Sequence, residues 1–257
     1  MTPLRRALVL LSVLAPVLAA GGAGAADDTT AACGAPPELL EPGAPLPATA
    51  RAVAAGHLRV LAVGSASVLG PGTSGPAAAW PARLEAMLAA RYPGLKVETV
   101  LRGAPGLTAA DSIAIILEEL RRAPAHLVLW QTGAVEAARN LDLDELAATL
   151  DTGLAQIGAA GSDAVLIDPQ FSRFLRANAN VEPYREAMQL GAAAHNTPLV
   201  RRYDLMHAWA EAEKVDLERA PRSARVATAD RLNDCLAQAI TELLVRGIEE
   251  AKAQPRP

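Results

Sequence analysis

The amino-acid sequence predicts an α/β domain in which helices cover both faces of a five-stranded parallel sheet. Two observations support this fold class. Short apolar runs rich in branched residues alternate along the chain with longer segments whose apolar residues recur at helical spacing. The 257 residues are also 51% hydrophobic and only 20% charged, so the chain has enough apolar material for one sizeable core.

Five segments have the length and composition of buried strands, and the first of them locates a candidate site. It ends at Gly64, where a run of small residues begins. In open parallel sheets, ligands bind at the carboxyl ends of the strands, so Ser65, Ala66 and Ser67 lie where a site is expected. The predicted strands are 58–63, 95–101, 126–130, 164–167 and 198–200.

Helices are predicted between and after these strands, from apolar residues that recur three or four positions apart. Pro93 and Gly94 end the first helix, and Thr108 is placed to cap the second. Strands that alternate with helices in this way imply parallel pairing. The predicted helices are 76–92, 108–122, 143–157, 181–195, 204–214 and 230–251.

The N-terminus has the pattern of an export signal. Two arginines near the start precede a short apolar run, and small residues at 23–25 offer a cleavage site. We expect 1–26 to be a signal peptide, with an uncleaved anchor as the alternative. Residues 27–56 are expected to form a Pro/Ala/Gly-rich arm, and 57–252 the folded domain. Cleavage would give a periplasmic or secreted protein without a membrane-spanning segment.

Two cysteines follow the predicted cleavage site, Cys33 and Cys235. In an oxidising compartment an even number of cysteines indicates a disulfide, which would tie the N-terminal arm to the closing helix. The alternative is that both are unpaired small apolar residues.

The charge and the motif content exclude several classes of function. The net charge is −4, which does not fit a nucleic-acid-binding surface. The chain has no internal repeats, no metal-spaced cysteines and no phosphate-binding loop, so we expect neither a metal nor a cofactor.

Several short stretches, in their order along the chain, resemble the SGNH/GDSL hydrolase superfamily. The chain is most similar to the exported bacterial branch whose first block reads G-S-S-S-T. The resemblance implies a flavodoxin-like three-layer α/β/α fold with a five-stranded parallel sheet. The stretches that carry it are 63–67 (VGSAS), 81–84 (PARL), 102–106 (RGAPG), 130–133 (WQTG), 168–171 (DPQF), 201–203 (RRY) and 235–237 (CLA).

Members of this superfamily hydrolyse esters, and the resemblance implies a role for particular positions. The nucleophilic serine lies two residues after the glycine of the first block, and here that residue is Ala66. Gly106 matches the glycine whose amide helps to form the oxyanion hole. The asparagine that supplies the second donor is replaced by Val135. Alanine offers no nucleophile and valine no side-chain donor.

The family's D-x-x-H motif, which supplies the base and the residue that orients it, is also replaced. An alignment on 235–237 places Ala224 and Ala227 at these two positions. An alignment on 233–234 instead places Thr228 and Arg231 there. In either register the dyad is missing, and no histidine follows His207 in the sequence.

We interpret the chain as a member of this superfamily that has lost esterase catalysis. It would bind a glycan, an acylated ligand or a partner protein of the cell envelope in the former catalytic cleft. A second hypothesis is an active carbohydrate or lipid deacylase that uses Ser65 or Ser67 with His207. A third is a structural envelope protein. The candidate binding residues are Gly64, Ser65, Ser67, Gly106, Gly133 and Asp168.

Simpler structural roles compete for these residues. Small polar residues such as Ser65 and Ser67 suit a tight turn. Asp204 and His207 have D-x-x-H spacing, but they share one face of a predicted helix, where the histidine can pair with Asp204 or pack. Asp168 precedes a proline and fits a turn. Arg201 and Arg202 are candidates for binding an acidic group, although charges at a strand end are usually solvated.

Overall fold

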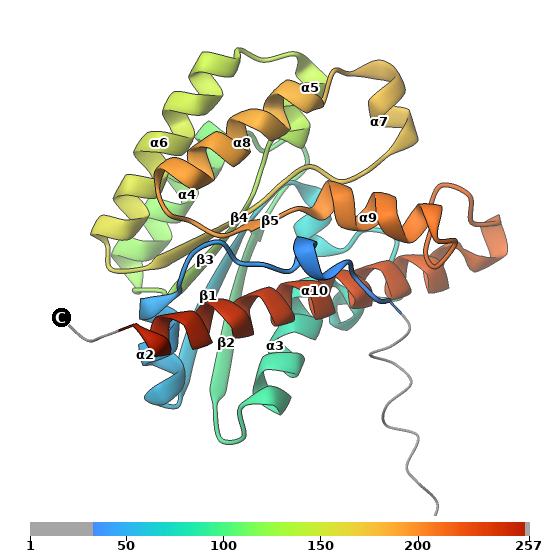
Figure 1. Cartoon of the computed structure of the whole chain (residues 1–257). Coiled ribbons are helices and arrows are strands. Elements are labelled where there is room, and N and C mark those ends of the chain that lie inside the picture. Colours follow the sequence, from blue (N-terminus) through green and yellow to red (C-terminus); the bar gives the residue numbers. More distant parts are fainter. Residues whose placement is uncertain (1–32, 255–257) are drawn as a thin grey trace, which may run out of the picture.

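The computed structural model describes residues 33–254 and contains a parallel five-stranded sheet (Figure 1). The strand order is β2-β1-β3-β4-β5, and all neighbours pair in parallel. This confirms the predicted fold class. The strands are β1 His57–Gly64, β2 Lys96–Gly103, β3 Leu127–Gln131, β4 Asp163–Ile167 and β5 Leu199–Val200.

Helices cover both faces of the sheet and form two separate hydrophobic cores (Figure 1). Successive residues of β1 face opposite sides, so that Val60 and Ala62 enter one core while Leu61 and Val63 enter the other. The first core involves α2 Pro47–Ala54, α3 Trp80–Arg91, α9 Arg202–Glu211 and α10 Arg225–Ala253. The second involves α4 Ala109–Arg122, α5 Ala134–Arg139, α6 Leu143–Ala159 and α8 Glu182–Ala194.

Short helical turns join these elements, and two of the predicted helices start four or more residues away from their predicted first residue. The segment predicted as one helix from 76 begins with a 3-10 turn, and α3 starts only at Trp80, with Pro81 in its first turn. The closing helix α10 begins five residues before its predicted start. The remaining short elements are η1 Pro37–Leu39, η2 Ala66–Leu69, η3 Pro76–Ala78, α7 Arg173–Asn178 and η4 Arg222–Ala224.

The segment predicted as a loose arm over 27–56 is, in its described part, packed into the fold. It contains α2, whose N-terminal amides donate to the carboxylate of Asp163 at distances of 3.2 Å from Ala48 and 2.7 Å from Thr49. Leu46 is 1% exposed and belongs to the first core. A cap supplied from the start of β4 explains why the local sequence alone does not indicate this helix.

The predicted disulfide between Cys33 and Cys235 is present, with a Cα–Cα distance of 5.4 Å. It ties the start of the described chain to the middle of α10. The predicted signal peptide at 1–26 lies outside the described residues. Within residues 33–254, no helix is both long and apolar enough to cross a bilayer.

The disulfide closes a loop of 202 residues, so its loss should destabilise the protein markedly. Because a covalent link across a long loop restricts the unfolded chain, we expect Cys33→Ser with Cys235→Ser to lower the free energy of unfolding by about 2–5 kcal/mol. Urea denaturation of the variant, and of the oxidised and reduced wild type, would measure this. Identical transitions with and without reductant would contradict the prediction.

Candidate functional site

The turn after β1 brings two serine hydroxyls against the end of β3. A Cβ atom on Gly64 would lie 2.6 Å from the Gln131 carbonyl oxygen and 2.8 Å from the Gln131 Cβ. Only glycine allows this close approach of the backbones. The chain then enters η2, and this places Ser65 and Ser67 over the Gln131 side chain.

These serines belong to a compact polar group that we call the Ser-Arg cluster, formed by Ser65, Ser67, Gln131, Gln170 and Arg202. Gln131 Nε2 donates to Ser65 Oγ at 3.1 Å and to Ser67 Oγ at 2.6 Å. Arg202 Nη1 donates to Ser67 Oγ at 3.2 Å and to Gln131 Oε1 at 3.0 Å. Its Nη2 donates to Gln170 Oε1 at 3.3 Å. Ser65 and Ser67 therefore lie at the carboxyl edge of the sheet, as predicted from the sequence.

The contacts of this cluster give the serines donors but no base. Guanidinium and amide N–H groups donate hydrogen bonds and accept none. The remaining neighbour of each hydroxyl is the other serine, at an Oγ–Oγ distance of 3.5 Å. A serine becomes a nucleophile when an adjacent group takes its proton, and no such group contacts Ser65 or Ser67 among the described residues.

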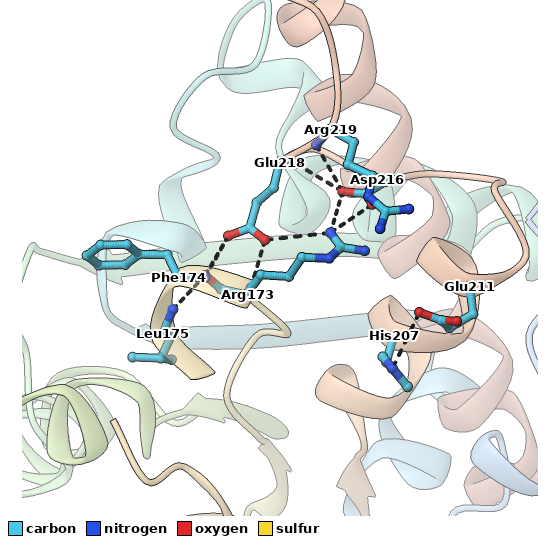
Figure 2. A network of polar contacts seen from close by, with 9 residues as sticks. Arg173, Phe174, Leu175, His207, Glu211, Asp216, Glu218 and Arg219 are labelled. Carbon is cyan, nitrogen blue, oxygen red and sulfur yellow. Dashed lines mark hydrogen bonds and ion pairs between the residues drawn. The ribbon is translucent and has the colours of Figure 1, made fainter. Parts of the chain in front are cut away.

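All four histidines of the chain lie within the described residues, and each is engaged elsewhere. His57 and His126 stack edge to face at the amino end of the sheet, and burial lowers the pKa of His126. His195 Nε2 lies 2.8 Å from Asp151 Oδ1. His207 Nε2 lies 3.8 Å from Glu211 Oε1 (Figure 2). The His207 ring also packs against Phe171, with ring centroids 4.8 Å apart.

The D-x-x-H pair of Asp204 and His207 is not formed. Asp204 Oδ1 accepts from Arg185 Nη2 at 2.7 Å, and its Oδ2 accepts from Arg201 Nε at 2.8 Å. The histidine packs against Phe171, as one of the simpler sequence interpretations allowed, and its ion-pair contact is with Glu211, not with Asp204. The Asp204 carboxylate thus pairs with two arginines and does not orient the His207 imidazole.

Four of the positions matched to the family's catalytic residues have the apolar side chains of alanine or valine. Ala66 begins η2, and Val135 lies half-buried in the first turn of α5. Ala224 ends η4, and Ala227 is exposed near the start of α10. In the second register, Thr228 donates to the Ala224 carbonyl at 2.9 Å inside the helix.

Two of the three glycines predicted to bind a ligand, Gly106 and Gly133, have left-handed backbone conformations, and a side chain lies close to each. At Gly106 a Cβ atom would lie 2.6 Å from Arg139 Nη2. At Gly133 it would lie 2.8 Å from the Met188 sulfur. The Gly133 amide donates to Glu136 Oε2 at 2.9 Å, so this amide is already paired.

Glu136 is a structural residue that the sequence analysis missed. Its carboxylate is buried and accepts hydrogen bonds from the amides of Ala109 and Gly133 and from Thr132 Oγ1 at 3.2 Å. It therefore joins the loop after β3 to the first turn of α4. The spacing of Gly133 and Glu136 is that of a capping box, which was the available signal.

Asp168, a predicted ligand contact, fixes the position of α9. It is fully buried, and its Oδ1 accepts from the Tyr203 amide at 2.8 Å while Oδ2 accepts from Arg185 Nε at 3.2 Å. Burial raises the pKa of Asp168 to about 7, although the Tyr203 amide and Arg185 oppose the shift. The hydrogen bonds of these two oxygens therefore help to fix the position of the neighbouring Arg202.

Arg202 is buried, contrary to the expectation that charges at this strand end are solvated. The residue is 6% exposed, and burial lowers its pKa to about 10, with Asp168 opposing the shift. Its guanidinium therefore remains positively charged at neutral pH. All three of its hydrogen bonds go to uncharged oxygens, and its Nε has no partner within the described residues.

Three residues of the Ser-Arg cluster line a cavity of about 290 Å³. The other parts of its lining come from the turn after η2, two further loops and the helices α9 and α10. Its lining includes Ser67, Gln170 and Arg202 from the cluster and several apolar side chains. These are Phe171, Met206, Ala210, Val215, Leu217, Ala229, Leu232 and Leu236.

One carboxylate holds the two loops of this cavity together. Glu218 accepts from Ser172 Oγ and the Arg173 amide, both at 2.7 Å, and from the Phe174 amide at 3.4 Å (Figure 2). Arg173 Nη1 also lies 2.8 Å from Asp216 Oδ2. We call residues 215–218 and these contacts the strap. It fixes the loop before α10 against the start of α7.

Replacing the buried Glu136 should destabilise the fold. Glu136→Gln puts an amide donor where the backbone amides require an acceptor, so we expect a loss of about 1–3 kcal/mol in the free energy of unfolding. Urea denaturation would measure it, with the exposed Glu145→Gln as the control. Equal stability of the two variants would contradict the role given to Glu136.

The strap should make stability depend on pH. Burial raises the pKa of Glu218, but the hydrogen bonds from Ser172 and the backbone, with the charge of Arg173, outweigh it and lower the pKa overall. The contribution is therefore complete above the ordinary value of 4.5 and is lost as the pH falls through the lower folded-state pKa. We expect Tm to fall less on acidification in Glu218→Gln than in the wild type. Parallel curves of Tm against pH for the two proteins would contradict this.

Comparison with solved structures finds the same fold in several proteins. TesA is 20% identical with a TM-score of 0.56, over 72% of this chain and 99% of that chain. A catalytic mutant of Axe2, an acetylxylan esterase from Geobacillus stearothermophilus, is 19% identical with a TM-score of 0.57, over 74% and 94% of the two chains. LAE5, an α/β hydrolase from the metagenome of Lake Arreo in Spain, is 20% identical with a TM-score of 0.56, over 73% and 96%.

At these identities the similarity shows the fold alone. A search of curated proteins gives no significant match. A family model, in contrast, matches residues 32–250, which is most of the chain. The stretches that resemble SGNH/GDSL hydrolases, the strand order and this match agree. The chain belongs to the non-GDSL lipase-like family, whose fold is that of the SGNH/GDSL-like hydrolases.

Proposed function

We propose that this protein binds a ligand in the cavity beside β1 and does not hydrolyse esters. The observation that supports this most directly is the state of the two serines. Their hydroxyl oxygens accept hydrogen bonds from Gln131 and Arg202, and no base contacts them among the described residues. The described residues form a cavity next to these serines, and none of them brings a base into contact with either hydroxyl.

The lack of a base argues against the rival hypothesis that the protein is an active deacylase. That hypothesis requires Ser65 or Ser67 to lose its proton to His207. The imidazole of His207 instead contacts Glu211 and Phe171. The Arg202 guanidinium would stabilise negative charge on Ser67 Oγ, but it is already protonated and takes no proton. During attack by Ser67, Arg202 would stabilise the negative charge on the serine oxygen, but it would not take the serine proton.

The oxyanion hole is incomplete as well. At the position of the family's asparagine, Val135 has no side-chain donor. A missing donor costs on the order of 3 kcal/mol of transition-state stabilisation in enzymes that use such sites. The lack of this donor, and of a base in contact with either serine among the described residues, together supports binding over turnover.

We place the ligand among glycans, acylated molecules or a partner protein of the cell envelope. The supporting observations are the export-like N-terminus and the disulfide, which is typical of oxidising compartments. A periplasmic or secreted location follows as part of the proposal. Fractionation of cells that express the full-length chain would test it.

The purified protein should leave p-nitrophenyl acetate and p-nitrophenyl butyrate unhydrolysed beyond the rate with an equal amount of heat-unfolded protein. The physical reason is that no group takes the proton of a serine. Spectrophotometric release of nitrophenolate would measure the rate. Turnover that disappears in Ser67→Ala or His207→Ala would contradict the proposal and favour the deacylase.

Restoring the nucleophile alone should not restore catalysis. Ala66→Ser places a hydroxyl at the family's nucleophile position, but the base and the side-chain oxyanion donor replaced by Val135 remain absent, so we expect no gain in esterase rate over the wild type. The matched control is Ala134→Ser, which adds a hydroxyl at the start of α5. New turnover in Ala66→Ser would mean that a base is present near η2.

A further inference from the structure

The cavity beside β1 contains a buried charge that the fold does not pair with a carboxylate. The Arg202 guanidinium has five N–H donors, and its three hydrogen bonds go to the neutral oxygens of Ser67, Gln131 and Gln170. Nε is buried without a partner in residues 33–254. Buried charges are normally paired, so this arrangement calls for an explanation.

Stability of the fold does not provide that explanation. Elsewhere the chain pairs its buried arginine fully, since Arg185 contacts Asp168, Asp204 and Glu182. Asp168 and Asp204 lie close to Arg202 in the chain or in space, yet their oxygens face Arg185, Arg201 and the Tyr203 amide. Neutral partners thus hold Arg202 in place, and its guanidinium contacts no carboxylate among the described residues.

Arg202 lines the cavity together with two of these neutral partners, Ser67 and Gln170. A guanidinium with hydroxyl and amide neighbours is the usual recognition group for a carboxylate or a phosphate. The unpaired buried charge and the cavity that it lines are two independent observations, and both point to an anionic ligand.

The rest of the cavity limits the ligand to a single negative charge and an apolar body. Its other walls are largely apolar, with Phe171, Met206 and Leu236 among the lining residues. The other charged lining groups are Asp216 and Glu218, which belong to the strap and are paired with Arg173. These two carboxylates would repel a doubly charged phosphate more than a monocarboxylate. A volume of about 290 Å³ also restricts the ligand to a small molecule.

We infer that this cavity is a binding site for a small amphipathic monocarboxylate, whose carboxylate pairs with Arg202 and whose apolar chain lies between α9 and α10. The inference rests on the proposed function and names the chemical class of the ligand. Ser67 and Gln170, which already contact Arg202, are the neutral polar groups next to the bound carboxylate.

The test is isothermal titration calorimetry of the full-length protein with octanoate, 1-octanol, octylammonium and octyl phosphate at neutral pH. Because a charge-assisted hydrogen bond is stronger than a neutral one, octanoate should bind about tenfold or more tightly than octanol. Octylammonium should not bind. Equal affinities of octanoate and octanol, tighter binding of octyl phosphate, or no binding of octanoate in the millimolar range would each overturn the inference.

A matched pair of variants assigns the effect to Arg202. Arg202→Gln should lower octanoate affinity by about tenfold or more and leave octanol affinity unchanged. Arg201→Gln removes the neighbouring charge, which pairs with Asp204 and does not line the cavity, and should bind octanoate as the wild type does. Equal losses in both variants would overturn the inference. If Arg202→Gln does not fold, the ligand series on the wild type decides alone.

These results remain distinct from a failure of the proposed function. A wild-type protein that hydrolyses p-nitrophenyl esters and also prefers octanoate refutes the non-hydrolytic role, but it keeps the carboxylate site. A protein without turnover that binds octanol and octanoate equally refutes only the carboxylate site.

Discussion

The placement of one buried cation determines how the site of this protein is built. The Arg202 guanidinium lies at the start of α9, where the Asp168 carboxylate holds the next residue by its backbone amide. From there it reaches the serine turn after β1, the end of β3 and the loop after β4. Three carboxyl-terminal strand ends are thereby joined through a single side chain. Such a charge is costly to bury, and its neutral hydrogen-bond partners compensate for only part of that cost.

This arrangement changes what the two serines can do. In a hydrolase of this fold class, the hydroxyl beside β1 needs a base, and the base needs a residue that orients it. Here the hydroxyls accept hydrogen bonds from an amide and a cation, while the four histidines have partners elsewhere. Apart from each other, the two hydroxyls therefore contact only hydrogen-bond donors within residues 33–254. In the proposed function, these donors serve to recognise a negative group.

The fold was largely predictable, since strands buried on both faces and helices with one apolar face leave a periodic signal in the local sequence. All five strands and their parallel pairing follow from such signals. The disulfide between Cys33 and Cys235 was instead predicted from the even number of cysteines. Helix α2 was missed because its N-terminal amides are capped by Asp163, more than a hundred residues later in the sequence. Local composition contains no information about a partner at that separation.

The site was less predictable, for the same physical reason. Ser65, Ser67 and Asp168 were located by their place after a strand, because topology alone gathers such positions at one edge of the sheet. The burial of Arg202 and of Glu136 depends on which side chains of other segments pack against them. These contacts cannot be inferred from a single sequence.

The most direct test of the central claim, that neither serine beside β1 is activated, is reaction with a fluorophosphonate followed by intact-mass and peptide analysis. Such probes label serines whose proton is removed by a neighbouring base. The account predicts that Ser65 and Ser67 stay unmodified under conditions that label a serine esterase completely. A stoichiometric adduct on either residue of the folded protein would contradict it.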